Sequence, residues 1–202
     1  MYSSTPHPIG SSRSSSIGIF ALQGAFIEHQ IMLDDLGCDT FQIRSMDDVK
    51  RNKIDGVVLP GGESTTMMKI LKKTGLDKWL IKNIKGGLPI FGTCAGTIIL
   101  SQSHLKLMDI DVDRNAYGSQ LSSFETNIKC EINKKNITID NAIFIRAPKI
   151  IKTGKGVKVL SKYKQAVILA NQNNMLVATF HPELTDDPRV HKYFLSLCGK
   201  RK

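Results

Sequence analysis

The chain has 202 residues, a hydrophobic content of 41% and a formal net charge of +10. That length allows one domain with a sizeable core, and the composition is ordinary for a globular protein. The basic residues are spread along the chain without interleaved aromatic residues, which argues against nucleic-acid binding, and the uncharged stretch at 88–103 is too short and too polar to span a bilayer.

The cysteines and the N-terminal composition indicate the compartment and the domain organisation. Cys38, Cys94, Cys130 and Cys198 are widely scattered and form no C-x-x-C pair, so the sequence predicts neither a metal site nor a disulfide framework. No apolar secretory segment follows the first residues, and we therefore expect a reducing, cytoplasmic compartment. Residues 1–16 contain seven serines and no acidic residue, which predicts an extension without fixed structure before a single domain at 17–202.

The first half of the chain alternates apolar strands with helical segments. Residues 17–23 form a near-continuous apolar run that predicts a central strand, and the segment 26–36, closed by Gly37, predicts a helix. A further helix is expected from Ser64, where the apolar residues share one face and the lysines lie largely off it. Further strands are expected at 40–44, 54–59 and 88–92.

The second half predicts shorter strands and a final helix. Alternating apolar and charged residues at 128–132 are typical of a half-exposed strand. The last helix is expected to have Asp187 as its N-cap and Pro188 at its first position. Together the patterns predict an α/β fold, a three-layer sandwich around a mostly parallel central sheet with helices on both faces and a small antiparallel strand extension. The remaining short strands are expected at 137–139, 142–145, 157–160, 166–170 and 175–180.

The most informative motif is Gly92-x-Cys94-x-Gly96, which lies between an apolar strand and an apolar helix. Glycines on either side allow the sharp strand–turn–helix bend of a nucleophile elbow, here with cysteine in the nucleophile position. A thiol at a helix N-terminus is also favoured as its thiolate. A lone cysteine in an apolar segment is usually a core residue, but the flanking glycines favour a functional role for Cys94.

A second motif, residues 175–183, is an apolar strand that ends in a histidine and a glutamate two residues apart. His181 can serve as the base for the Cys94 thiol, and Glu183 can orient the imidazole. In an extended segment, side chains at i and i+2 project to the same side, which suits this arrangement. A histidine alone is more often structural, but its place at a strand end in a chain with an elbow cysteine favours catalysis.

Other strand ends and turns offer further candidate residues. The oxyanion that forms when a thiolate attacks a carbonyl needs N–H donors, and the backbone of Ala95 and the glycine turn at Gly61-Gly62 can supply them. Arg146 follows an apolar strand and can anchor a carboxylate. The residues alone leave Arg114 and Arg146 equally open to being surface charges, and they assign no role to the other histidines.

These segments resemble the class I, or triad, glutamine amidotransferases, and they are most similar to the glutaminase subunits of pyridoxal 5′-phosphate synthases. The resemblance extends from residue 17 to the last helix. The triad motif marks the superfamily, and the other segments are more specific. Besides the elbow, the resemblance rests on Ala21-Leu22-Gln23-Gly24-Ala25, Leu59-Pro60-Gly61-Gly62-Glu63-Ser64-Thr65-Thr66, Arg114-Asn115-Ala116-Tyr117-Gly118, Phe144-Ile145-Arg146-Ala147-Pro148 and Phe180-His181-Pro182-Glu183-Leu184-Thr185.

The resemblance implies an activity and a set of site residues. Glutamine is expected to be hydrolysed to glutamate and ammonia through a γ-glutamyl thioester on Cys94, without a cofactor. His181 and Glu183 would complete the triad. An arginine pair suits the α-carboxylate of free glutamine. The glutamine-binding residues implied by the resemblance are Gly62, Glu63, Ser64, Arg114, Ile145 and Arg146.

The resemblance also implies a partner, a (β/α)8-barrel synthase subunit that receives the ammonia through a tunnel. That subunit would combine it with a pentose phosphate and a triose phosphate to make pyridoxal 5′-phosphate. Docking is expected to switch on hydrolysis by ordering the oxyanion hole, with the loop near Gln23 at the contact. In one departure from the family, which usually has Arg-Gln after Gly118, this chain has Ser119-Gln120 and so lacks one positive charge there.

Three alternative functions remain open from the sequence. The chain could be a class I glutaminase of a histidine, purine or folate pathway. It could instead be a cysteine hydrolase or peptidase on a similar sheet. A third alternative is a catalytically silent binding module that keeps the elbow for packing.

Overall fold

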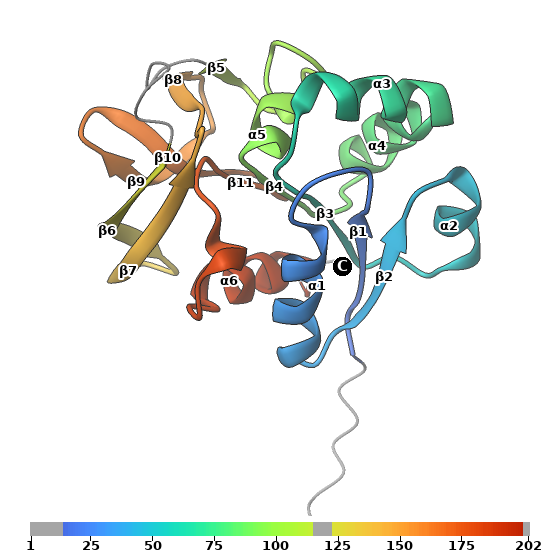
Figure 1. Cartoon of the computed structure of the whole chain (residues 1–202), viewed down its shortest axis with the longest axis horizontal. Coiled ribbons are helices and arrows are strands. Elements are labelled where there is room, and N and C mark those ends of the chain that lie inside the picture. Colours follow the sequence, from blue (N-terminus) through green and yellow to red (C-terminus); the bar gives the residue numbers. More distant parts are fainter. Residues whose placement is uncertain (1–13, 115–122, 200–202) are drawn as a thin grey trace, which may run out of the picture.

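The computed structural model describes residues 14–114 and 123–199, and one mixed sheet runs through them (Figure 1). Its parallel half has the strand order β2-β1-β3-β4-β11. Every residue of β3, β4 and β11 is buried, which explains the continuous apolar runs in this half. The strands are β1 (Ser16–Phe20), β2 (Asp39–Ile43), β3 (Gly56–Leu59), β4 (Ile90–Thr93) and β11 (Met175–Ala178).

From β11 onward the sheet is antiparallel, in the order β11-β10-β9-β6-β7, and β8 pairs with β10 and β5. The chain leaves the parallel half after β4 and returns to it only as β11, which pairs directly with β4. The segments that follow β4 and β11 therefore lie side by side. The antiparallel strands are β5 (Ile110–Asp113), β6 (Ser123–Ile132), β7 (Lys135–Ile145), β8 (Lys149–Thr153), β9 (Lys158–Tyr163) and β10 (Ala166–Gln172).

Helices cover both faces of the parallel half (Figure 1). On one face α1 and α6 pack against the sheet, where Leu33 and Phe194 join Phe91 in one apolar cluster. On the other face, Met67 of α3 and Leu80 of α4 share a second cluster with α2 and α5. The predicted three-layer α/β architecture is confirmed. The helices are α1 (Phe26–Asp35), α2 (Met46–Arg51), α3 (Ser64–Thr74), α4 (Leu76–Lys85), α5 (Ala95–Leu100) and α6 (Arg189–Cys198).

Some element boundaries differ from the sequence-based predictions. The strands expected at 137–139 and 142–145 are one strand, β7, which continues through Asn141 at a φ of 52° and is accommodated by a bulge in its pairing with β6. The final helix begins at Arg189 with Pro188 as its N-cap, so the prediction of Asp187 as N-cap was wrong. The Asp187 carboxylate nevertheless accepts the Arg189 N–H at 3.0 Å. The elements α2, β5 and β8 were not predicted. A short 3₁₀ helix, η1 (Pro182–Leu184), stands where the sequence suggested an extended segment.

The predictions for the N-terminal extension and for Ser119 fall largely on residues 1–13 and 115–122, which lie outside the described residues. The first strand begins at Ser16, one residue earlier than expected. Ser14 donates a hydrogen bond to the Asp39 carboxylate on β2. Residues 14–16 therefore pack with the sheet.

Candidate active site

A sharp turn joins β4 to α5 and carries Cys94. Cys94 has a φ of 46° and a ψ of −102°, a combination that residues other than glycine rarely adopt. The Cys94 N–H donates to the Ala178 oxygen at 2.8 Å, which ties the turn to β11. A Cβ atom on Gly96 would lie 2.1 Å from the Leu59 oxygen, so glycine is needed for α5 to begin so close to β3. The turn has the strand–turn–helix form that the glycines predict.

The end of β11 brings His181 and Glu183 to the same edge of the sheet as Cys94. Because Ala178 of β11 pairs in parallel with Thr93 of β4, the residues that follow both strands meet. His181 and Glu183 are only 6% and 5% exposed, and His181 Nδ1 lies 2.7 Å from Glu183 Oε1. His181 and Cys94 both flank Gly61, and the Cys94 side chain is near enough to raise the pKa of the imidazole. Cysteine, histidine and glutamate thus form one continuous, buried arrangement.

The glycine turn after β3 flanks this arrangement. A Cβ atom on Gly61 would lie 2.5 Å from His181 Cε1 and 3.3 Å from Cys94 Cβ, so a side chain there would displace the imidazole. Gly62 has a φ of 155°, which strains residues with a side chain. Ala95 is buried directly after Cys94, at the start of α5. The two candidate backbone donors, Gly62 and Ala95, therefore belong to the turns on either side of the thiol.

Burial and hydrogen bonding oppose each other in setting the charge of His181. Burial lowers the pKa of His181, but its interactions with Cys94 and Glu183 outweigh burial and raise that pKa to about 10. Burial raises the pKa of Glu183, and the hydrogen bond from His181 opposes this shift. His181 is therefore an imidazolium at neutral pH, which is the form that pairs with a cysteine thiolate.

A cavity of about 770 Å³ opens over Cys94 and His181. Ala95 and Glu183 are not part of its lining, because both are buried behind it. The structure therefore gathers all the candidate residues at one site. The candidate substrate-binding residues that line the cavity are Gly62, Glu63, Ser64, Arg114, Ile145 and Arg146.

The N-terminus of α3 forms one wall of the cavity. Glu63 caps the helix, and its carboxylate accepts hydrogen bonds from the backbone N–H groups of Thr65 at 3.0 Å and Thr66 at 2.7 Å. Hydrogen bonds from the hydroxyl and N–H of Thr66, followed by that from Thr65, lower the pKa of Glu63 to about 2. Arg114 donates to Ser64 Oγ at 2.7 Å and lies 3.8 Å from Glu63 Oε1. A guanidinium and a carboxylate are thus held next to each other at the cavity.

The end of β7 contributes another wall. The Ile145 oxygen accepts a hydrogen bond from the Cys94 thiol at 3.8 Å, and Ile145 is 39% exposed. Arg146 has a φ of 44°, in the left-handed region that costs energy for a residue with a side chain. This turn at Arg146 ends β7 beside the thiol and places both residues in the cavity lining.

Several cavity residues were not predicted. Gln23 Oε1 accepts the Glu63 N–H at 3.2 Å, and Glu28 also lines the cavity. Both residues follow β1, which pairs in parallel with β3, so the two strands end at the same edge. Their position after a predicted central strand was the one feature of the sequence that could have indicated a place in the site. The other unpredicted lining residues are Gly24, Ala25, Ile98 and Leu184.

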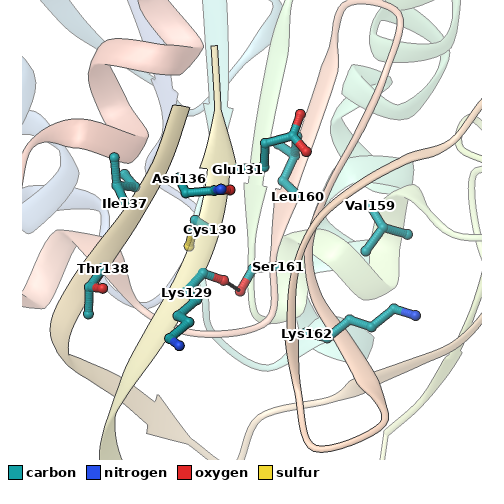
Figure 2. A pocket seen from close by; sticks show the side chains of 10 residues that line it. All are labelled: Lys129, Cys130, Glu131, Asn136, Ile137, Thr138, Val159, Leu160, Ser161 and Lys162. Carbon is teal, nitrogen blue, oxygen red and sulfur yellow. Dashed lines mark hydrogen bonds between the residues drawn. The ribbon is translucent and has the colours of Figure 1, made fainter. Parts of the chain in front are cut away.

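Another cavity, of about 600 Å³, lies between β6, β7 and β9 (Figure 2). Ser161 Oγ donates to the Lys129 oxygen at 2.7 Å and links β9 to β6 there. Burial raises the pKa of the Cys130 thiol, so this lining cysteine stays protonated at neutral pH. Among the described residues that line it there is no histidine, and the cavity lacks the acid–base pair found at Cys94.

Two further findings concern residues 14–114 and 123–199 alone. Each helix in these ranges is too short or too polar to cross a membrane. The same ranges contain no group of three His, Cys, Asp or Glu side chains that could hold a metal ion.

Comparisons with known proteins identify close relatives of this chain. The model of the SNO glutamine amidotransferase family matches residues 19–200. The pyridoxal 5′-phosphate synthase subunit PdxT of Thermosipho africanus (strain TCF52B) is 48% identical over 191 residues, which cover 91% of this chain and 99% of that protein. The subunit of the same name from Streptococcus pneumoniae (strain ATCC 700669 / Spain 23F-1) is 46% identical over 195 residues, which cover 92% of this chain and 98% of that protein.

Solved structures agree with this relationship. A crystal structure of a glutamine amidotransferase matches with 38% sequence identity and a TM-score of 0.82. The match covers 91% of this chain and 98% of that one. The structure of PurLQS from Thermotoga maritima shares the fold alone, because it is only 15% identical. Its TM-score is 0.69, and the match covers 91% of this chain and 99% of that one. Because the family model spans nearly the whole chain and the relatives match along nearly their full length, this chain belongs to the SNO glutamine amidotransferase family.

Proposed function

We propose that this chain is the glutaminase subunit of a pyridoxal 5′-phosphate synthase and hydrolyses L-glutamine to L-glutamate and ammonia through a thioester on Cys94. The observation that carries the proposal is the meeting of Cys94, His181 and Glu183 after adjacent strands, beside a cavity of about 770 Å³. The PdxT relatives, at 46% and 48% identity, support the pathway.

Cys94 acts as the nucleophile. Its thiolate attacks the side-chain amide carbon of glutamine, which forms a C–S bond and moves the C=O electron pair onto oxygen. When this intermediate collapses, the C–N bond breaks, and the His181 imidazolium donates its proton to the nitrogen that leaves as ammonia. Neutral His181 then takes a proton from the water that attacks the thioester, and the C–S bond breaks to release glutamate and restore the ion pair. Glu183 accepts the His181 Nδ1–H and stabilises the imidazolium.

The oxyanion of each tetrahedral intermediate is stabilised by backbone N–H groups. Ala95 follows the nucleophile at the N-terminus of α5, where the helix dipole also favours negative charge. Gly62 lies in the turn beside Cys94 and His181 and supplies the second donor. A single donor of this kind is worth about 10²- to 10³-fold in kcat.

The charged groups of the cavity complement a free amino acid. Arg114 and Arg146 receive the α-carboxylate of glutamine, and the ionised Glu63 receives its α-ammonium group. Gly62, Ser64 and Ile145 complete the binding surface. A peptide bond at either end of the substrate would remove one of these charges, which favours glutamine over peptides.

A synthase subunit is the proposed consumer of the ammonia. We propose a (β/α)8 barrel that receives it through a tunnel, because free ammonia in water is largely protonated and no longer nucleophilic. Docking near Gln23 would order the oxyanion hole. The reducing cytoplasm is the proposed compartment, since Cys94 must remain a thiol and no disulfide joins the four cysteines.

Glutamate release, measured with and without the synthase subunit, tests this function. We expect glutamine turnover that rises when the synthase is present, together with formation of pyridoxal 5′-phosphate from the two sugar phosphates. Cys94→Ala should lower turnover by at least about 10³-fold while the melting temperature stays close to that of the parent.

Other outcomes would replace the proposal. Turnover by Cys94→Ala at the parent rate would contradict the thioester. Activity that appears only with the synthase of another pathway would assign the chain to that pathway. Cleavage of peptides without a response to glutamine would indicate a peptidase, and no turnover under any condition would indicate a binding module.

A further inference from the structure

A buried group of histidines behind Glu183 takes no part in the mechanism above. His29 of α1 and His191 of α6 are fully buried, and His29 Nδ1 lies 2.9 Å from His191 Nε2. His29 Nε2 lies 3.0 Å from Thr93 Oγ1 and 3.4 Å from Glu183 Oε2. The group therefore links α6, through α1, to the carboxylate that holds His181.

We propose that His29 is a positioning residue of the active site, which holds Glu183 through its Nε2–H while His191 keeps the proton on that nitrogen. The inference rests on the roles proposed above for His181 and Glu183. It assigns His29 no contact with substrate.

The two oxygens of Glu183 differ in their hydrogen bonding. Oε1 accepts the His181 Nδ1–H at 2.7 Å. Oε2 is buried and has no hydrogen-bond partner among the described residues, a state that is costly for a carboxylate. His29 Nε2, at 3.4 Å, is close enough that a small rotation of the carboxylate would complete a hydrogen bond. His29 can therefore fix the plane of the Glu183 carboxylate.

The proton positions follow from these contacts. A proton on His29 Nδ1 would leave the lone pair of Nε2 facing the lone pairs of Glu183 Oε2. A proton on Nε2 avoids this repulsion, is shared between Thr93 Oγ1 at 3.0 Å and Glu183 Oε2 at 3.4 Å, and leaves Nδ1 as the acceptor of the His191 Nε2–H. His191 Nδ1, which has no partner among the described residues, is then an unprotonated nitrogen rather than a buried N–H without an acceptor.

The surrounding charges agree with a neutral His29. Burial, followed by His191 and His181, lowers the pKa of His29 well below its ordinary value. Burial also lowers the pKa of His191, to about 3. The remaining charged neighbour of Glu183 is Glu28 of α1, whose negative charge raises the pKa of Glu183. A donor from His29 offsets this effect and favours the ionised carboxylate.

The test compares His29→Leu with the parent in two assays. One is the pH profile of glutaminase activity in the complex with the synthase. The other is the pH dependence of Cys94 alkylation by iodoacetamide in the chain alone. In His29→Leu we expect kcat to fall about tenfold and KM to stay within about twofold. The acid limb of the pH profile and the midpoint of Cys94 alkylation should both move to higher pH by about one unit. The reason is that loss of the His29 donor disfavours ionised Glu183, and this in turn weakens the Cys94–His181 ion pair.

Three further variants separate positioning from general packing. His29→Gln places an amide N–H near the position of Nε2. Its alkylation midpoint should therefore lie close to that of the parent and well below that of His29→Leu. His191→Phe keeps a ring beside Phe91 but removes the donor to His29, and it should move the midpoint in the same direction by a smaller amount. Leu80→Ala creates a cavity in α4, in the apolar cluster on the other face of the sheet, and it should lower the melting temperature without moving the midpoint.

The proposal is overturned if neither His29→Leu nor His191→Phe moves the alkylation midpoint. A downward shift would also overturn it, since it would mean that a neutral Glu183 donates to His29. If the parent complex hydrolyses no glutamine, the proposed function fails, while the alkylation midpoints still decide the role of His29.

Discussion

His181 lies between a thiol and a carboxylate, and this setting explains how a buried imidazole keeps its charge. Burial disfavours the imidazolium, but Cys94 and Glu183 together raise its pKa to about 10. The charged imidazole is therefore available at neutral pH to donate its proton to a leaving nitrogen.

Arg114 offers a test of substrate binding that leaves the nucleophile intact. Arg114→Met keeps much of the side-chain length but removes the guanidinium beside Ser64 and Glu63. We expect the KM for glutamine to rise at least about tenfold, because the α-carboxylate loses a charged partner, while kcat changes much less. Steady-state glutamate release by the synthase complex measures both constants. Arg51→Met, at an exposed site on α2, is the matched control, and a lower kcat at unchanged KM would contradict the assigned role.

Residue chemistry was predictable from the sequence where it is encoded locally. Cys94 lies between its two glycines, and His181 and Glu183 are two residues apart at a strand end. His29 has no such signal, because its partners Thr93 and His191 are 64 and 162 residues away in the chain. Only the packing of α1 against α6 and β4 brings these side chains together.

At the scale of elements, α3 combines stability with binding. Glu63 ends the loop after β3 and caps the helix, so its carboxylate is fixed by Thr65 and Thr66 in the cavity wall. The same hydrogen bonds that hold the helix end therefore also orient a charge toward the proposed substrate.

Acid should weaken the cap of α3. The pKa of Glu63 in the folded chain is about 2, below its ordinary value of 4.5, so its stabilising effect is present above pH 4.5 and is lost as the pH falls toward 2. Glu63→Gln cannot titrate, and the parent should melt at a higher temperature than this variant near neutral pH. The difference should shrink as the pH falls through this range, measured by circular dichroism. A difference that stays constant with pH would show that the charge of Glu63 contributes nothing to the cap.

The contact between α5 and β3 depends on the missing side chain of Gly96. Gly96→Ala would place a Cβ atom 2.1 Å from the Leu59 oxygen, and moving the helix would also move Cys94. We expect the free energy of unfolding in urea to fall by about 2 kcal/mol or more, with loss of glutaminase activity. Gly199→Ala is the control, because a Cβ atom at Gly199 would have no neighbour within 4 Å and the residue has a φ of −73°. That variant should stay within about 0.5 kcal/mol of the parent.

Elements with a long regular pattern were predicted, and short or interrupted ones were not. The apolar runs of β3 and β4 identified buried strands. Helix α2 spans only Met46–Arg51, too few residues to show a helical period, although Ser45 and Asp48 form a capping box at its start. In β7 the polar Asp140 and Asn141 interrupt the apolar pattern, which is why it resembled two strands.

At the scale of the whole molecule, the strand order creates the active site. The antiparallel strands β5 to β10 separate β4 from β11 along the chain, yet β11 pairs directly with β4. If β11 did not pair with β4, His181 would lie apart from Cys94. Sequence patterns predict the strands themselves but carry little information about such order, because neighbouring strands in space are distant in sequence.

The shared sheet also predicts that the two halves unfold together, as a single domain spanning residues 17–202 would. Trp79, the only tryptophan, lies on α4 against Phe20 and reports on the parallel half by fluorescence. Cys130 is buried in β6 and reports on the antiparallel half by its alkylation. Since β11 bonds to both halves, we expect one urea midpoint for the two probes in the intact chain. Alkylation of Cys130 at clearly lower urea than the fluorescence change would mean that the antiparallel strands form a separate unit, and the single-domain description would then be wrong.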